Sequence, residues 1–387
     1  MSHGGLPPEE VIRRREAKRE RPRGRDMTPA VGRRGEAGGW RRAVPDAAVA
    51  MLRPHFEDGR WSFLYKDDTK YAADDGGAAR DSLVAAAAQR ARGGTEVPVE
   101  VQGPIINAPV WTWEVPLYFW FGGIATGAAF VAVAADVAGD HRTARIARRV
   151  SIGAIGPGTP LLILDLGRPE RFLHMMRIFK LRSPMSTGAW CLTAFSSVMG
   201  TAIAADVVGR PRTARALGGV GAGLATYLGS YTGVLLASTA VPVWARSREF
   251  LPPIFICTAA ATGAAATRLV LSATGTPPGH PSRVALGTVE TVAMAAELAL
   301  SEINERRLGA LGEPLREGRP GRLFSLARWS VFTGLALRAA RQRGGPWTHH
   351  LASLLYLAAG LAYRFAWVGA GRTSAADHEA VALNARR

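Results

Sequence analysis

Cysteine is nearly absent from this sequence of 387 residues: there are two, Cys191 and Cys257, and both lie in apolar segments. No Cys-x-x-Cys pair occurs, so the chain lacks the thiolates that hold an iron–sulfur cluster, and covalent haem and cysteine-based zinc sites are excluded too. None of the eight histidines lies in the middle of a long apolar segment, which argues against an intramembrane bis-histidine haem. We therefore predict no metal centre on this chain.

Charge is distributed unevenly. The sequence is 48% hydrophobic and yet carries a net charge of +17. Residues 1–110 are polar and contain no long apolar run, whereas residues 111–372 alternate long apolar stretches with short basic clusters. A polar head before an apolar body is typical of membrane proteins. We predict an all-α integral membrane protein with a polar N-terminal extension and a short C-terminal tail at 373–387.

The apolar body divides into about eight segments that are each long enough to cross a bilayer as a helix, which takes roughly 20 residues. Lysine and arginine are spread too evenly over the loops to set the orientation. We predict a multi-pass protein of the cell (inner or cytoplasmic) membrane, with its helices in two four-helix bundles. The predicted segments are 113–137, 147–166, 187–208, 215–239, 251–272, 284–303, 322–340 and 349–370.

The polar extension has two parts. Residues 1–42 are rich in arginine, glycine and proline, a composition typical of disorder. Residues 43–110 contain aromatic side chains among acids, which suits contact with a partner protein, although a partly ordered tail explains the pattern equally well.

An internal repeat relates two parts of the body. AADVAGDHRTAR at 134–145 matches AADVVGRPRTAR at 204–215, which makes Asp136 and Asp206 equivalent positions at helix ends. We expect two helix hairpins of one orientation that form a four-helix unit. The simplest role for the two aspartates is capping or pairing with nearby arginines.

The loop at 164–190, LDLGRPERFLHMMRIFKLRSPMSTGAW, concentrates polar chemistry at the end of the second apolar segment. Charge at membrane depth is costly and usually functional. Asp165, Arg168, Arg171 and His174 could bind a polar head group and exchange protons with it. The alternative is a basic loop that binds lipid phosphates and caps helices.

Three charges lie deeper in the body. Glu290 and Glu297 are seven residues apart and share one helix face, and Arg268 in the preceding segment is a plausible partner. Buried carboxylates of this kind can relay protons. A salt bridge that fixes helix packing is the equal alternative.

Four motifs together resemble one family. DLGRPERFLHM, SPMSTGAW, WEVPLYFWFGGIATG in the first segment and GSYTGVLLASTAVPVW at 229–244 are similar to the NrfD/PsrC family of polysulfide-reductase membrane subunits, over roughly residues 111–272. The resemblance implies an eight-helix membrane subunit without haem. It also implies quinone or menaquinone as bound substrate, a ferredoxin-like iron–sulfur subunit as partner, and a catalytic subunit that is often of the molybdopterin class.

The resemblance also implies roles for single residues. Asp165, Arg168 and His174 match the loop near the family's quinone site, and Arg171 lies in the same motif. Tyr231 matches the tyrosine expected against the quinone. The candidate contributions of the first segment are Glu114, as proton acceptor or interfacial cap, and Tyr118. Buried polar groups such as Arg268, Glu290 and Glu297 stand where the family's proton path has been suggested.

We therefore predict a membrane anchor that exchanges electrons between the quinone pool and an iron–sulfur partner, with proton uptake or release. Membrane lipid is expected around it and nucleic acid is not a partner. Alone, the chain should be non-catalytic. Two alternatives remain: a small-solute transporter, which would need broken helices and a midplane site, and a structural anchor with a degenerate quinone site.

Overall fold

The computed structural model describes residues 106–165, 170–340, 346–377, 380–381 and 384. All of them belong to one unit of the chain, residues 54–387. The predicted disorder of 1–42 and nearly all of the partner contact predicted for 43–110 fall outside the described residues.

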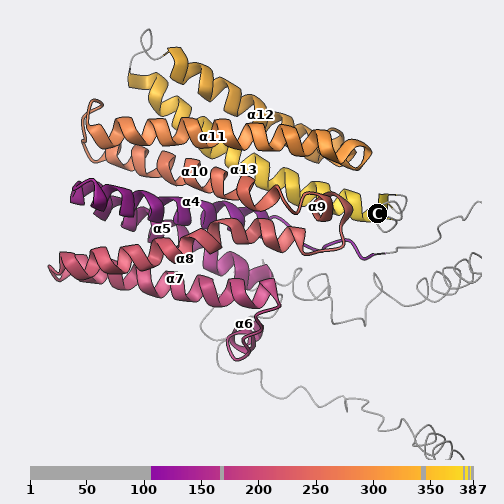
Figure 1. The fold of residues 1–387 in the computed structure, drawn as a ribbon, viewed down its shortest axis with the longest axis horizontal. Helices are drawn as coiled ribbons and strands as arrows, with labels where there is room; N and C mark the ends of the chain where they lie inside the picture. Colours follow the sequence, from indigo (N-terminus) through magenta and orange to yellow (C-terminus); the bar gives the residue numbers. More distant parts are fainter. Residues whose placement is uncertain (1–105, 166–169, 341–345, 378–379, 382–383, 385–387) are drawn as a thin grey trace, which may run out of the picture. The chain divides into compact units, whose positions relative to one another are not determined.

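All regular secondary structure in the described part of the chain is helical, which confirms the all-α prediction (Figure 1). Eight long helices overlap the eight predicted apolar segments, and three short ones connect them. The long helices are α4 (Glu114–Val137), α5 (His141–Asp165), α7 (Pro184–Val207), α8 (Pro211–Ala237), α10 (Leu251–Ala273), α11 (Pro281–Leu308), α12 (Gly318–Ala339) and α13 (Pro346–Ala376). The short ones are α6 (Glu170–Met175), α9 (Pro242–Arg246) and the 3-10 helix η2 (Gly309–Leu315).

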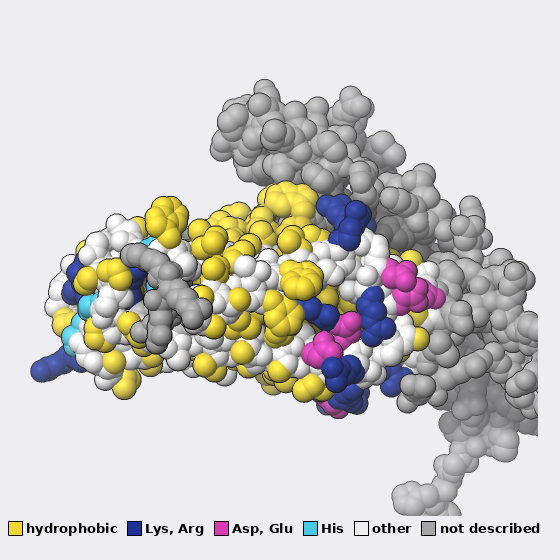
Figure 2. Space-filling model, turned by 90° about the horizontal axis from the view of Figure 1, so that it is seen from above, with side chains coloured by type: hydrophobic (Ala, Val, Ile, Leu, Met, Phe, Trp, Pro, Cys, Tyr) yellow, Lys and Arg dark blue, Asp and Glu magenta, His cyan; other side chains and the backbone are white. Residues whose placement is uncertain are grey.

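Six of the long helices are long and apolar enough to cross a membrane: α4, α7, α8, α10, α11 and α13. Helices α5 and α12 are of similar length, but several arginines lower their mean hydropathy, so the number eight stays a prediction. On α12, Leu326, Trp329 and Phe332 are nevertheless exposed, as lipid contact requires. Figure 2 shows one face of the molecule with hydrophobic side chains along the middle and charged ones gathered toward its two ends.

Helix α4 lies at the centre of the packing. It contacts α5, α8 and α10, and α13 packs on it as well. Other close pairs are α7 with α8, α8 with α10, α10 with α11, α10 with α13, and α12 with α13. The contact between α4 and α10 is more extensive than the α7–α8 and α10–α11 contacts, although less extensive than α4–α5 and α12–α13. The division into two separate four-helix bundles therefore stays a prediction.

Two glycines allow α4 and α10 to approach closely. A Cβ added at Gly127 would overlap the carbonyl oxygen of Ala259, and one added at Gly263 would overlap the backbone at Gly127. Small residues at such crossings let helix backbones touch.

Gly127→Ala should therefore destabilise the protein by about 1–3 kcal/mol, the usual cost of overpacking. Gly122→Ala is the matched control in the same helix, because a Cβ there meets nothing within 4 Å. Unfolding midpoints in detergent measure both variants. Equal midpoints for the two would show that the crossing is not as tight as the structure has it.

The repeat converges on one arginine. Arg148 of α5 is buried, and its guanidinium donates to Asp136 at 2.6 Å and to Asp206 at 2.7 and 3.0 Å. The expected pairing of the equivalent aspartates with an arginine is thus confirmed. By the same offset of 70 residues, Arg148 corresponds to Gly218, and a Cβ at Gly218 would lie 3.6 Å from the Arg148 guanidinium. One copy of the repeat supplies the cation and the other leaves room for it.

Candidate functional site

The connection between α5 and α7 is held by the side chains of the SPMSTGAW motif. Ser183 caps α7 by accepting from the backbone N–H of Ser186, and Pro184 occupies the first turn, where its missing N–H costs nothing. The Ser186 hydroxyl accepts from the N–H of Lys180 at 3.0 Å and donates to the carbonyl of Ile178 at 3.1 Å. The motif therefore fixes the path of the loop back to the helix.

A cavity of about 40 Å³ lies where this loop meets the helix ends. It brings together Asp165 from the end of α5, Tyr118 from the second turn of α4, and Tyr231 from α8. Both tyrosines are almost fully buried, whereas Asp165 is partly buried. The remaining lining is aromatic or aliphatic: Trp111, Val115, Phe119, Leu162, Met175, Met185 and Leu235.

Gly188 determines where Tyr231 can lie. A Cβ at this glycine would overlap the Tyr231 ring, so the motif glycine of α7 makes the space that the tyrosine fills. One residue earlier, the Thr187 hydroxyl is hydrogen-bonded to that of Tyr227 at 2.6 Å. Two successive motif residues thus fit two tyrosines one turn apart on α8.

Glu114 lies beside the cavity. Its carboxylate accepts a hydrogen bond from the Thr112 hydroxyl and is 2% exposed. It lies close enough to Asp165 for their charges to interact. Two carboxyl groups thus come from the ends of neighbouring helices at the edge of the apolar body.

The other predicted loop residues lie differently. His174 is exposed on α6 and does not line the cavity, whereas the next residue, Met175, does. Arg171 is in α6, but its side chain is outside the described residues, and so is the whole of Arg168.

Sequence reasoning missed Trp111, Met175 and Met185 as parts of the cavity wall. All three lie in or beside the quoted motifs, and that membership was the available signal. Trp111 is held by stacking on Trp244, with ring centroids 5.4 Å apart, and the Trp244 indole donates to the carbonyl of Trp367. These contacts connect the cavity wall to α9, which contains Trp244, and to α13, which contains Trp367.

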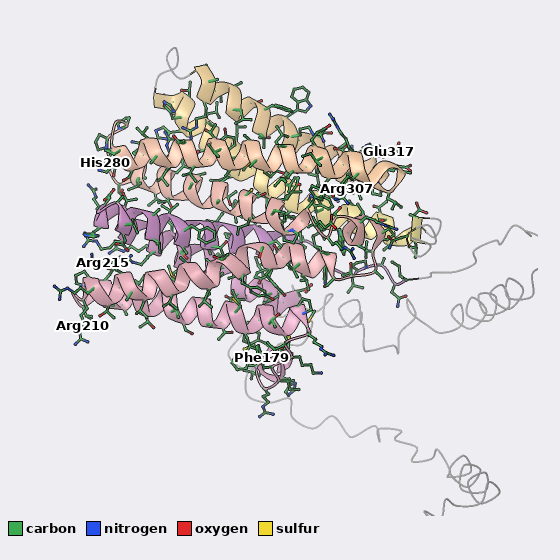
Figure 3. The ribbon with its side chains drawn as sticks, in the orientation of Figure 1. Phe179, Arg210, Arg215, His280, Arg307 and Glu317 are labelled. Carbon is green, nitrogen blue, oxygen red and sulfur yellow. The ribbon has the colours of Figure 1, made fainter. Side chains whose placement is uncertain are left out.

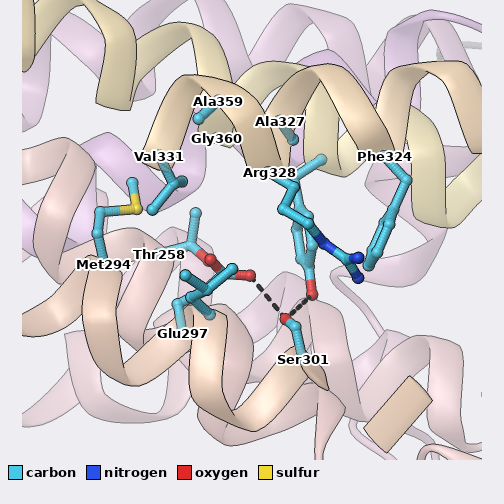
Figure 4. A pocket seen from close by; sticks show the side chains of 12 residues that line it. Thr258, Met294, Glu297, Ser301, Phe324, Ala327, Arg328, Val331, Ala359 and Gly360 are labelled. Carbon is cyan, nitrogen blue, oxygen red and sulfur yellow. Dashed lines mark hydrogen bonds between the residues drawn. The ribbon is translucent and has the colours of Figure 1, made fainter. Parts of the chain in front are cut away.

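A second, smaller cavity of about 20 Å³ contains Glu297 (Figure 4). The Ser301 hydroxyl donates to the Glu297 carboxylate at 2.8 Å and is hydrogen-bonded to the Tyr363 hydroxyl at 2.6 Å. The cavity has room for about one water molecule. Glu297 is thus the end of a short polar chain inside the fold.

Glu290 pairs with a residue other than the one predicted. Its carboxylate accepts from Arg338 of α12 and from the Ser353 hydroxyl, whereas Arg268 donates to Ser353 and to two backbone carbonyls. Glu290 and Glu297 are separated by about 10 Å along α11, and the buried Met294 lies between them. The hydrogen bonds described here do not link the two carboxylates.

The family model described as "Polysulphide reductase, NrfD" matches residues 104–301 of this chain. A search of curated proteins found no match. The matched region contains the motif loop, all residues of the 40 Å³ cavity, and both Glu290 and Glu297. With its family model covering half of the sequence and several helices able to cross a bilayer, this chain is a multi-pass membrane protein and belongs to the NrfD family.

Proposed function

We propose that this chain is the quinone-reactive membrane subunit of a respiratory oxidoreductase complex, with its quinone site at the cavity formed by Asp165, Tyr118 and Tyr231. One observation carries the proposal: three helices bring a carboxyl and two phenol groups into one apolar, aromatic cavity at the membrane edge. A quinone head group has polar oxygens on an apolar ring and needs such an environment.

The described cavity is tight for a ring-sized ligand, but its wall can adapt. Met175 and Met185 form part of it, and Met185 is half exposed. Methionine is unbranched and changes rotamer easily, so these side chains can move aside at low cost. A head group would then lie between the tyrosines and the loop.

The tyrosines and the carboxyl groups have different proposed roles: the tyrosines donate hydrogen bonds and the carboxyl groups accept protons. A quinol supplies electrons and protons when it binds, and a quinone takes them up. The Tyr231 and Tyr118 hydroxyls can each donate a hydrogen bond to a carbonyl oxygen. Asp165 can accept a proton as general base, and Glu114 beside it can hold the next one. Exposed His174, one residue from the cavity wall, is our proposed exchange point with water.

We place the iron–sulfur partner, which would pass electrons to a catalytic subunit, on the same end of the molecule. Leu173, Ile178, Phe179 and Leu181 are exposed there on and after α6, next to Lys180. An exposed apolar patch with charged neighbours suits a protein contact. Figure 3 shows Phe179 on this projecting segment.

The proposal includes a proton route through Arg268, Glu290 and Glu297. The Glu297–Ser301–Tyr363 chain supports it, whereas the Glu290–Arg338 ion pair fits the packing role equally well. The transporter alternative finds less support, because each long helix runs unbroken through the residues described for it.

Tyr231→Phe tests the site. Removing the hydroxyl should lower quinone-linked turnover of the purified complex by roughly tenfold, because one hydrogen bond to the substrate is lost. Tyr227→Phe is the matched control on the same helix: its hydroxyl bonds Thr187 and does not line the cavity. Full turnover in Tyr231→Phe, or an equal loss in both variants, would move the quinone site elsewhere.

A further inference from the structure

A third cavity, of about 530 Å³, lies at the end of the molecule opposite to the quinone site. Helices α11 and α12 lie together where η2 joins them and diverge toward the far end of α12 (Figure 1). The cavity is lined from four helices, by residues near the end of α10, the start of α11, the end of α12 and the start of α13. A space of this size falls within the usual range for ligand sites, about 300–1,000 Å³.

Its charged lining is positive. Arg268, Arg283 and Arg338 all line it, together with His349, and no carboxylate is among the lining residues. The Arg338–Glu290 pair supplies the one carboxylate bonded to these arginines among the described residues. Three guanidinium groups against one carboxylate leave an excess of positive charge that is buried and costly without a counter-ion.

The arginines also have unused donors. The Nε atoms of Arg283 and Arg338 are both buried and have no hydrogen-bond partner. The whole of Arg283 is only 3% exposed. The Nη1 of Arg283 donates to the carbonyl of Thr276 at 2.6 Å. Gly287 keeps the space open, since a Cβ there would lie 3.1 Å from the Arg338 guanidinium. Buried donors normally have partners, so these indicate a missing acceptor.

We propose that this cavity binds a phosphate group, and that its source is the head group of an anionic phospholipid. Guanidinium groups pair with phosphate through charge-assisted hydrogen bonds, and basic pockets between membrane helices bind lipid head groups. Arg283 lies in the first turn of α11 and Arg338 in the last turn of α12. Lipid head groups are expected at such helix ends. Val284 and Leu335 line the apolar part, and the exposed Val292 continues along α11 where an acyl chain would lie.

The experiment uses the full chain purified in detergent with its bound partners. The unfolding midpoint is followed while phosphatidylglycerol, phosphatidylcholine or inorganic phosphate is added, and native mass spectrometry counts bound lipid. We expect phosphatidylglycerol to stabilise the protein where phosphatidylcholine does not. Stabilisation by inorganic phosphate, with no further gain from lipid, would retain the phosphate site and identify an aqueous source.

Arg283→Gln should weaken this binding by roughly tenfold or more. This arginine has no carboxylate partner among its described hydrogen bonds, so its removal strands no buried acid. Arg215→Gln is the matched control: it is exposed at the same end of the molecule (Figure 3) and should bind like wild type. Unchanged binding in a folded Arg283→Gln would overturn the proposal. If Arg283→Gln fails to fold, the titrations of the wild-type protein provide the test. A wild-type protein that does not prefer phosphatidylglycerol and does not bind phosphate would also overturn the proposal.

Discussion

Asp165→Asn is expected to lower quinone-linked turnover by at least roughly a hundredfold while the complex still assembles. A positioned general base typically contributes a factor of about 10² to 10⁴, and asparagine keeps the size of the side chain but cannot accept the proton. Asp165 lines the cavity together with Tyr118 and Tyr231, so the loss should fall on the reaction more than on folding. Steady-state turnover with a soluble quinol analogue measures the effect.

Glu317→Gln is the control for this change. Glu317 is an exposed carboxylate at the end of the molecule that also carries Phe179 (Figure 3), and it should keep full activity. Asp165→Glu adds a second test, since it restores a carboxyl group and should recover part of the rate. Wild-type turnover in Asp165→Asn would exclude the carboxylate from the reaction and favour the structural-anchor alternative.

Arg148→Met is expected to cost about 3–5 kcal/mol of folding free energy, the usual loss when one partner of a buried ion pair is removed. Asp136 and Asp206, each 8% exposed, would then be left without their shared cation. Unfolding midpoints and the yield of intact protein in detergent measure the loss. Most of the lost folding free energy comes from leaving two buried carboxylates without a cation, and less comes from the lost packing contacts.

The neighbouring Arg149→Met makes the same chemical change at an exposed position of the same helix and should cost little. A triple variant, Arg148→Met with Asp136→Asn and Asp206→Asn, should recover much of the stability, because no buried charge remains unpaired. A single variant as stable as wild type would show that these aspartates find another cation or become protonated at no cost.

The positions of the helices were largely predictable, because each long apolar run of the sequence became one helix. What the runs could not show is why α5 tolerates a charge in its interior: Arg148 meets Asp206 from a helix 58 residues away in the chain. Likewise Glu290 pairs with Arg338 instead of Arg268, which is nearer in the sequence, because α12 folds back beside α11. Pairings of this kind depend on packing, which helical periodicity does not record.

The candidate site was predictable in part and for a different reason. The motifs pointed to Asp165, Tyr118 and Tyr231, and these three line one cavity. The phase of α6 was not predictable, because six residues give too few turns to define a buried face. Met175 therefore faces the cavity where His174 was expected.

The unequal repeat has a consequence for biogenesis. The hairpin of α4 and α5 contains both an acid and its cation, Asp136 and Arg148, whereas the hairpin of α7 and α8 contributes Asp206 to that arginine and places Gly218 against it. Because Asp136 and Arg148 both precede Asp206 in the sequence, the first hairpin can form its ion pair before the second hairpin is synthesised. Asp206 meets this arginine only when the second hairpin packs against the first. The direction of translation thus supplies the cation before the acid that needs it.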